Sequence, residues 1–128
     1  MLDPKIRDFA QAKNFGSISF HLPSGDIGSH VMWVHADDEH VLINTEVHRA
    51  KYKAIQANPN VTVTVWGDNA YQYAEVRGTV VDEVRGPEAR DDIDMLSRKY
   101  TGKHYGTQIQ SERVILKIAP TRMRTNGL

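Results

Sequence analysis

The 128-residue sequence is long enough for one compact domain with a hydrophobic core, over residues 1–128, and too short for two ordinary domains. Its 16 lysine and arginine residues balance 16 aspartate and glutamate residues, so no overall charge favours nucleic acid or a membrane surface as a partner. The lack of cysteine excludes disulfides, thiolate nucleophiles, iron–sulfur clusters and cysteine-containing zinc sites. Because neither a signal peptide nor a run of about 18 apolar residues occurs, we expect a cytoplasmic protein.

The periodicity of apolar residues predicts a mainly β domain with accessory helices. Asp3-Pro4 is typical of a helix start, and the alternation of valine with threonine in residues 60–66 is typical of a half-buried strand. In chain order we expect a helix at 3–13, strands at 16–21, 29–35 and 40–44, a helix at 45–58, strands at 60–66 and 71–84, a helix at 87–100 and a strand at 113–118. The total is about six strands and three helices.

The connections between these elements indicate how they assemble. Short polar turns join the first three strands, which predicts a meander, and Gly78 within a long strand indicates a bulge or a barrel corner. The last strand is expected to end before Pro120. Strands joined mostly by short turns favour an antiparallel barrel with helices packed outside it, not a parallel α/β sheet.

The densest chemical signal lies at residues 44–53, where the third strand gives way to the second helix. A helix N-terminus offers free backbone N–H groups and the positive end of the helix dipole, which suit a phosphate. Arg49, Lys51 and Lys53 add three cations, although only Arg49 and Lys53 share a helix face. On spacing alone, a solvated basic helix face is favoured over a phosphate site.

Aromatic residues give a second signal. Trp33 lies within a predicted strand, and Trp66 ends another, so either could contact a flat aromatic ligand. Core packing or a dimer interface is the alternative role for both. Trp66 is the better ligand candidate, because it falls on the threonine face of its strand beside a turn.

Signatures of side-chain catalysis are missing. The six histidines show no His-Glu-x-x-His or other metal-binding spacing, so we expect no metal site. No Gly-x-Ser-x-Gly, Gly-x-Gly-x-x-Gly or Walker motif occurs. Glu75 and Arg77 share one strand face, where a structural ion pair is expected. The pattern suits a protein whose cofactor carries the reaction, and no catalytic residue is assigned.

Four segments in a fixed order carry a family resemblance. They are Val31-Met32-Trp33-Val34; Val41-Leu42-Ile43-Asn44-Thr45 followed by Arg49-Ala50-Lys51; residues 58–63; and residues 73–80. In order and spacing, across residues 15–118, the chain resembles the flavin and deazaflavin oxidoreductases with the split β-barrel of pyridoxamine 5'-phosphate oxidase. Its compact length and the Tyr-x-Glu-Val-Arg-Gly pattern at 73–78 are most similar to the branch that uses coenzyme F420.

The resemblance implies an F420-dependent oxidoreductase that transfers hydride from the reduced deazaflavin to a conjugated small molecule. It also implies a homodimer with the cofactor in a groove between the subunits. Arg49 and Lys51, with Lys53 as a further candidate, would hold the phosphate, and Asn44 and Thr45 would meet it at the strand end. The backbone from Met32 to Val34 would line the ring system, and Trp66 would close the pocket from the partner subunit.

Alternatives stay open at this point. Family members commonly have a shorter, glycine-rich link before the basic pair, whereas Glu46-Val47-His48 intervene here. FMN would fit much the same cations, so an FMN-dependent oxidase or reductase is one alternative. A protein that stores or carries F420, haem or fatty acid without turnover is another. Tyr71, Tyr73 and Tyr105 are candidate proton donors or packing residues.

Overall fold

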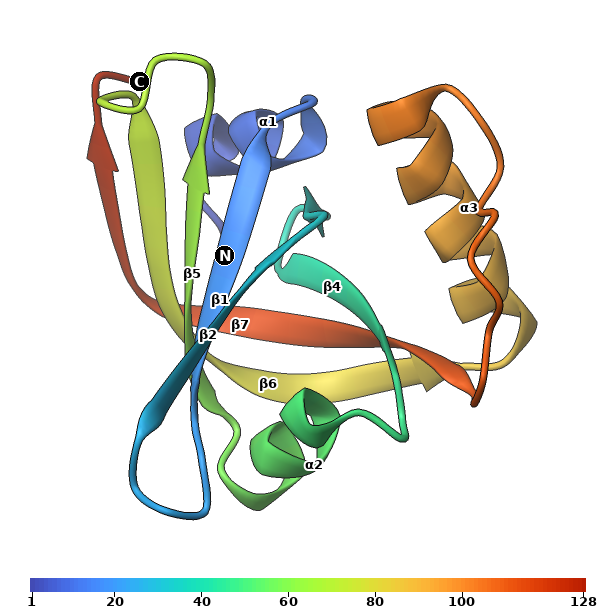
Figure 1. Cartoon of the computed structure of the whole chain (residues 1–128). Helices are drawn as coiled ribbons and strands as arrows, with labels where there is room; N and C mark the ends of the chain where they lie inside the picture. The colour runs from blue at the N-terminus through green and yellow to red at the C-terminus, as the bar shows by residue number, and fades with distance from the viewer.

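One antiparallel seven-stranded sheet, curled into a split barrel, carries three helices on its outside (Figure 1). The computed structural model describes residues 1–128, and the strand order is β2-β1-β5-β6-β7-β4-β3. The elements are α1 (Pro4–Gln11), β1 (Phe15–His21), β2 (Ile27–Met32), β3 (His35–Ala36), β4 (Val41–Glu46), α2 (Ala50–Ala57), β5 (Asn60–Trp66), β6 (Tyr73–Arg85), α3 (Pro87–Thr101) and β7 (Arg113–Asn126). The mainly β architecture with three outer helices is confirmed.

The predicted meander is wrong, and the strand expected at 29–35 is two strands. β2 pairs with β1 alone, whereas β3 pairs with β4 at the opposite end of the sheet. The chain leaves the sheet at Trp33 and Val34 because α3 takes the backbone groups of Val34. The Tyr100 hydroxyl accepts from Val34 N at 3.3 Å, and Lys99 Nζ donates to Val34 O at 2.7 Å. The break explains why there are seven strands and not six.

The two long strands β6 and β7 connect the halves of the barrel. Both bend sharply and stay paired with each other: one part of β6 lies beside β5, with the end of β7 on its other side, and the remaining parts run toward α3 (Figure 1). The predicted bulge at Gly78 is confirmed, because the β6–β7 register shifts between Arg77 and Gly78. A Cβ atom on Gly78 would overlap the Ala119 carbonyl oxygen. Pro120 does not end β7, because it lies at this irregularity opposite Gly78, where no regular ladder bond is lost.

The second helix is shorter than the sequence predicts. Residues 45 and 46 stay in β4, since Thr45 and Glu46 are in register with Val114 and Arg113 of β7. α2 therefore begins at Ala50, after a turn. This delay matters for the site, because it places a glutamate and an arginine side by side on neighbouring strands.

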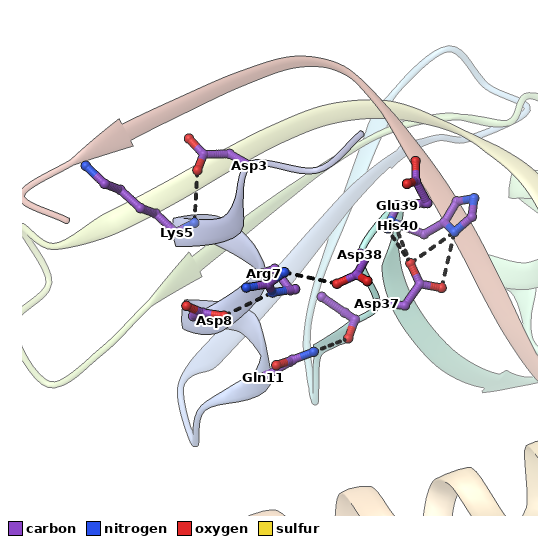
Figure 2. A network of polar contacts seen from close by, with 10 residues as sticks. Asp3, Lys5, Arg7, Asp8, Gln11, Asp37, Asp38, Glu39 and His40 are labelled. Atoms are coloured by element: carbon purple, nitrogen blue, oxygen red, sulfur yellow. Dashed lines mark hydrogen bonds and ion pairs between the residues drawn. The ribbon is translucent and has the colours of Figure 1, made fainter.

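Helix α1 closes one end of the barrel. Ile6 and Ala10 of this helix, and Leu2 just before it, are buried in the main apolar core with the inward residues of β1, β4, β5, β6 and β7. Figure 2 shows the polar contacts that fix α1 against the segment joining β3 to β4. Arg7 Nη1 donates to Asp38 Oδ1 at 3.0 Å, and Gln11 Nε2 donates to a backbone carbonyl at 2.9 Å. None of the three helices is long and apolar enough to cross a membrane.

Candidate functional site

A cleft of about 880 Å³ opens between the end of β2, the start of α2 and the inner side of α3. It is polar and apolar in comparable parts, with cations at one end and aromatic side chains along its wall. The residues that line it are Lys13, Phe15, His30, Val31, Met32, Trp33, Asn44, Arg49, Lys51, Asp68, Ile93, Leu96, Tyr100, Thr101, Tyr105, Thr107 and Arg113.

Lys51 is the most unusual residue of the cationic end. Only 6% of its surface is exposed, it lines the cleft, and its ammonium group makes no hydrogen bond or ion pair with the protein. Burial, and then the charges of Arg49 and Arg113, lower the pKa of Lys51 from 10.5 to about 8. A largely buried cation that pairs with no carboxylate is unfavourable, and a bound anion would relieve that cost, so this end of the cleft suits a negative charge.

Arg113 supplies a second buried cation at the start of β7. Its Nε donates to Asn44 Oδ1 at 2.8 Å, and its guanidinium lies over the Tyr105 ring at 5.4 Å from the centroid. Its Nη1 is buried and makes no hydrogen bond, although it lies 3.5 Å from a carboxylate oxygen of Glu46. Burial lowers the pKa of Arg113, which remains charged. Asn44 and Tyr105 thus fix the orientation of the Arg113 guanidinium, and its Nη1 group can still donate a hydrogen bond to a ligand.

The amide of Asn44 links α3 to this cation. Its Nδ2 donates to Ala89 O at 2.8 Å and to Asp92 Oδ2 at 2.9 Å, while its oxygen faces Arg113. Burial raises the pKa of Asp92, and the hydrogen bond from Asn44 opposes that rise. Because all the polar atoms of the amide are engaged, Asn44 fixes the position of Arg113.

The aromatic wall is organised around Trp33. Its ring stacks on Tyr100, with centroids 5.5 Å apart and planes 4° from parallel, and Tyr105 meets it edge-on at 6.1 Å. The Tyr100 hydroxyl donates to Asn14 O at 2.6 Å. This hydrogen bond fixes the position of the Tyr100 ring, and it uses the proton of the hydroxyl within the protein.

Comparison with known proteins decides the family. The model of the pyridoxamine 5'-phosphate oxidase family matches residues 2–127, nearly the whole chain. The chain belongs to the pyridoxamine 5'-phosphate oxidase family. A search of curated proteins found no match.

Solved structures with the same fold include members with different ligands. An F420 reductase is 28% identical, with a TM-score of 0.81 over 96% of this chain and 98% of that one. The heme storage protein HutZ of Vibrio cholerae is 11% identical, with a TM-score of 0.67 over 99% and 96%. An FMN-binding protein of Nostoc punctiforme, related to pyridoxamine 5'-phosphate oxidase, is 13% identical, with a TM-score of 0.59 over 90% and 73%. The last two similarities concern the fold alone.

In this family member, the residues proposed from sequence do not all lie at the cleft. It is lined by Met32, Trp33, Asn44, Arg49 and Lys51. The other four predicted cofactor-binding residues do not line it, and they are Val34, Thr45, Lys53 and Trp66.

Each of those four has a different environment. Val34 and Thr45 are fully buried, and the Thr45 hydroxyl has no hydrogen-bond partner. Lys53 is exposed on α2. The Trp66 ring lies 6.1 Å from that of Phe15, which does line the cleft. Trp66 is therefore adjacent to the cleft, one ring away from it.

Sequence reasoning missed Arg113, Tyr100 and His30 as cleft residues. A charged residue at the start of an otherwise apolar strand was a usable signal for Arg113, although its neighbours could not be known before the β4–β7 pairing was. Tyr105, for which the sequence leaves a proton donor and a packing residue open, packs with its ring against both Trp33 and Arg113. Desolvation, with the charges of Lys51 and Arg49, lowers the pKa of His30.

The residues of the cleft fit a phosphate-bearing aromatic cofactor. Lys51, which lines the cleft, and the unbonded Nη1 of Arg113 suit a phosphate, and a stacked aromatic wall suits a flat ring system. No group of three or more histidine, cysteine, aspartate or glutamate side chains comes together as a metal site. The ion pair predicted between Arg77 and Glu75 is present at 3.1 Å, away from the cleft.

Proposed function

We propose that this protein is a cytoplasmic F420-dependent oxidoreductase that transfers hydride from the reduced deazaflavin to a conjugated small-molecule acceptor. The observation that carries the proposal is the buried, unpartnered Lys51 between Arg49 and Arg113, at one end of a cleft with an aromatic wall. The family match and the 28% identity to an F420 reductase over almost the full length of both chains support it.

The side chains of the cleft would bind and orient the cofactor, and they would take no covalent part in the reaction. Arg49, Lys51 and Arg113 would hold the cofactor phosphate through charge-assisted hydrogen bonds. Met32 and Trp33 would border the ring system and keep water from it. When bound, reduced F420 supplies the hydride that reduces an electron-poor carbon of the acceptor. Since the hydroxyl of Tyr100 is engaged by Asn14, it is not available as a proton donor.

The proposal includes a homodimer in which the second copy completes the site. Two apolar side chains at the rim of the cleft, Val31 and Phe15, are 75% and 49% exposed, and β2 is an edge strand. Large exposed apolar groups beside a cleft favour a contact with another chain. In such a dimer Trp66, which packs against Phe15, would reach the cofactor bound to the partner.

Fluorescence titration with F420 and, separately, with FMN at fixed salt tests the cofactor. Micromolar or tighter binding of F420 with little binding of FMN is expected, followed by oxidation of reduced F420 when a quinone or enone acceptor is added. Tight FMN binding would instead make the protein an FMN-dependent oxidase or reductase, the second candidate, because the same three cations suit its phosphate. Binding without turnover of any acceptor would identify a carrier.

Variants of the anion end test the assigned contacts. Replacing Arg49 and Lys51 together with alanine should weaken cofactor binding by several kcal/mol at most, as expected for lost charge-assisted hydrogen bonds. The fold should remain intact by circular dichroism. An unchanged affinity would reject this phosphate site.

A further inference from the structure

We propose that Glu46 is a positioning residue of the anion site: its buried carboxylate sets the places of Arg49 and Arg113 and ties the 102–112 segment to the rim of the cleft. This inference rests on the proposed function, because it presupposes that an anion binds beside Lys51. Glu46 does not line the cleft, so it would act through its neighbours and not by touching the ligand.

The two oxygens of the Glu46 carboxylate contact different groups. The residue is 2% exposed. Oε1 accepts hydrogen bonds from the backbone N–H groups of Gln110 at 2.7 Å and Ser111 at 2.8 Å. Oε2 lies 3.5 Å from both Arg49 Nη2 and Arg113 Nη1. One carboxylate therefore connects a backbone segment to two of the three cations of the site.

The carboxylate is charged in this environment. Burial alone would raise the pKa of Glu46, but the N–H groups of Ser111 and Gln110, and then Arg113 and Arg49, outweigh it and lower the pKa. His48 also faces it, with Nδ1 at 4.0 Å from Oε1. A negative charge is thus held permanently within a cluster of cations.

Arg113 is held from two sides by this arrangement. Asn44 fixes its Nε, and Glu46, its register partner on β4, fixes the Nη1 side of the guanidinium. A planar guanidinium held at two of its edges presents its remaining donors in one direction. Loss of either support would let the side chain turn away from the ligand.

The 102–112 segment brings Tyr105 and Thr107 to the cleft. Its last residues are attached to the end of β4 and to the turn that follows. Besides the Glu46 contacts, the Ser111 hydroxyl lies 2.6 Å from His48 Nδ1, and Val47 N donates to Glu112 O at 3.0 Å. Glu46 thus contacts both the two arginines and the segment that carries Tyr105.

The Glu46→Gln variant distinguishes two roles of Glu46, because a positioning residue and a mere nearby charge predict opposite changes in anion affinity. Glutamine keeps the size and one oxygen for the two N–H groups, but it removes the charge that attracts the arginines. If Glu46 were only a nearby negative charge, its removal would raise the positive potential and tighten anion binding. If it positions the arginines, binding should weaken about tenfold or more, as for the loss of charge-assisted contacts.

The experiment compares Kd for F420 and FMN among wild type, E46Q, E46D and E112Q. Glu112 is the matched control, because it is a nearby carboxylate that pairs with Arg85 at 2.9 Å and lies outside the cleft. E112Q should bind as wild type does, and E46D should be intermediate between wild type and E46Q. If circular dichroism shows that E46Q is unfolded, the test uses E46D only. Weaker binding by E46D than by wild type then supports the proposal, and wild-type affinity overturns it.

The outcomes separate this inference from the proposed function. If wild type binds neither F420 nor FMN, the anion site itself is wrong. If wild type binds one of them and folded E46Q binds it equally well or more tightly, the anion site stands and the positioning role of Glu46 is overturned.

Discussion

Replacing Lys51 with methionine should stabilise the protein at pH 7 and weaken anion binding at the same time. Methionine has a similar length and no charge, and Lys51 is 6% exposed without a partner. Its pKa falls from 10.5 to about 8 on folding, first through burial and then through Arg49 and Arg113. That difference corresponds to about 3 kcal/mol that opposes folding at pH 7.

The pH dependence follows from the direction of this shift. Between pH 8 and pH 10.5 the unfolded chain keeps the Lys51 proton that the folded protein has lost, so the stability of wild type rises with pH in this window. The opposing energy is fully present below pH 8 and is almost absent at pH 10.5. The advantage of K51M should therefore be large at pH 7 and small at pH 10.5.

Thermal and urea unfolding in phosphate-free buffer, at pH 7 and at pH 10.5, measure this difference. A gain of about 3 kcal/mol corresponds to a Tm higher by about 10 °C for a domain of this size. Lys53→Met is the matched control, because Lys53 is exposed on the same helix, and it should stay within about 0.5 kcal/mol of wild type. Cofactor at a hundred times the wild-type Kd should add about 2.7 kcal/mol to the stability of wild type and much less to that of K51M. The reasoning is refuted if K51M is no more stable at pH 7, or if its gain is the same at both pH values.

Three further predictions concern the site and the barrel. The affinity for FMN or F420 should fall about tenfold from pH 7 to pH 9, because the Lys51 pKa of about 8 then requires proton uptake on binding; a flat profile by titration would exclude Lys51 as a ligand. Gly78→Ala should cost about 2 kcal/mol or more in urea unfolding, since the new Cβ overlaps Ala119 O, and wild-type stability would disprove that close approach. Tyr100→Phe should cost about 1–3 kcal/mol by loss of its bond to Asn14 O, measured by thermal unfolding, whereas a neutral effect would mean that the hydroxyl is not needed to hold the wall.

Local chemistry made much of the fold predictable from sequence. The N-cap Asp3, which accepts a hydrogen bond from Lys5 N, starts α1 where the Asp-Pro pair indicated. The valine–threonine alternation gave β5 at Asn60–Trp66, and Gly78 marked the bulge. Such signals are contained within a few neighbouring residues, so they need no knowledge of the rest of the chain.

The predictions that failed depend on contacts between distant residues. Nothing near Val34 in the sequence shows that Lys99 and Tyr100 take its backbone groups and split one predicted strand into β2 and β3. In the same way, an apolar run before Pro120 gave no sign that β7 continues to Asn126, because that extension depends on pairing with β6.

For the site, the sequence by itself determined a basic strand-to-helix corner and an aromatic segment next to a strand end. It could not tell a solvated basic helix face from an anion site, because the two differ in burial and not in spacing. Only the tertiary structure shows that Lys51 is buried and not solvated, and that pairing of β4 with β7 brings Arg113 to the same cleft, which is why we propose an anion site. The physical reason is that the energy of a charge is set by the solvent and the charges around it, and folding brings those from residues more than 60 positions apart in the chain.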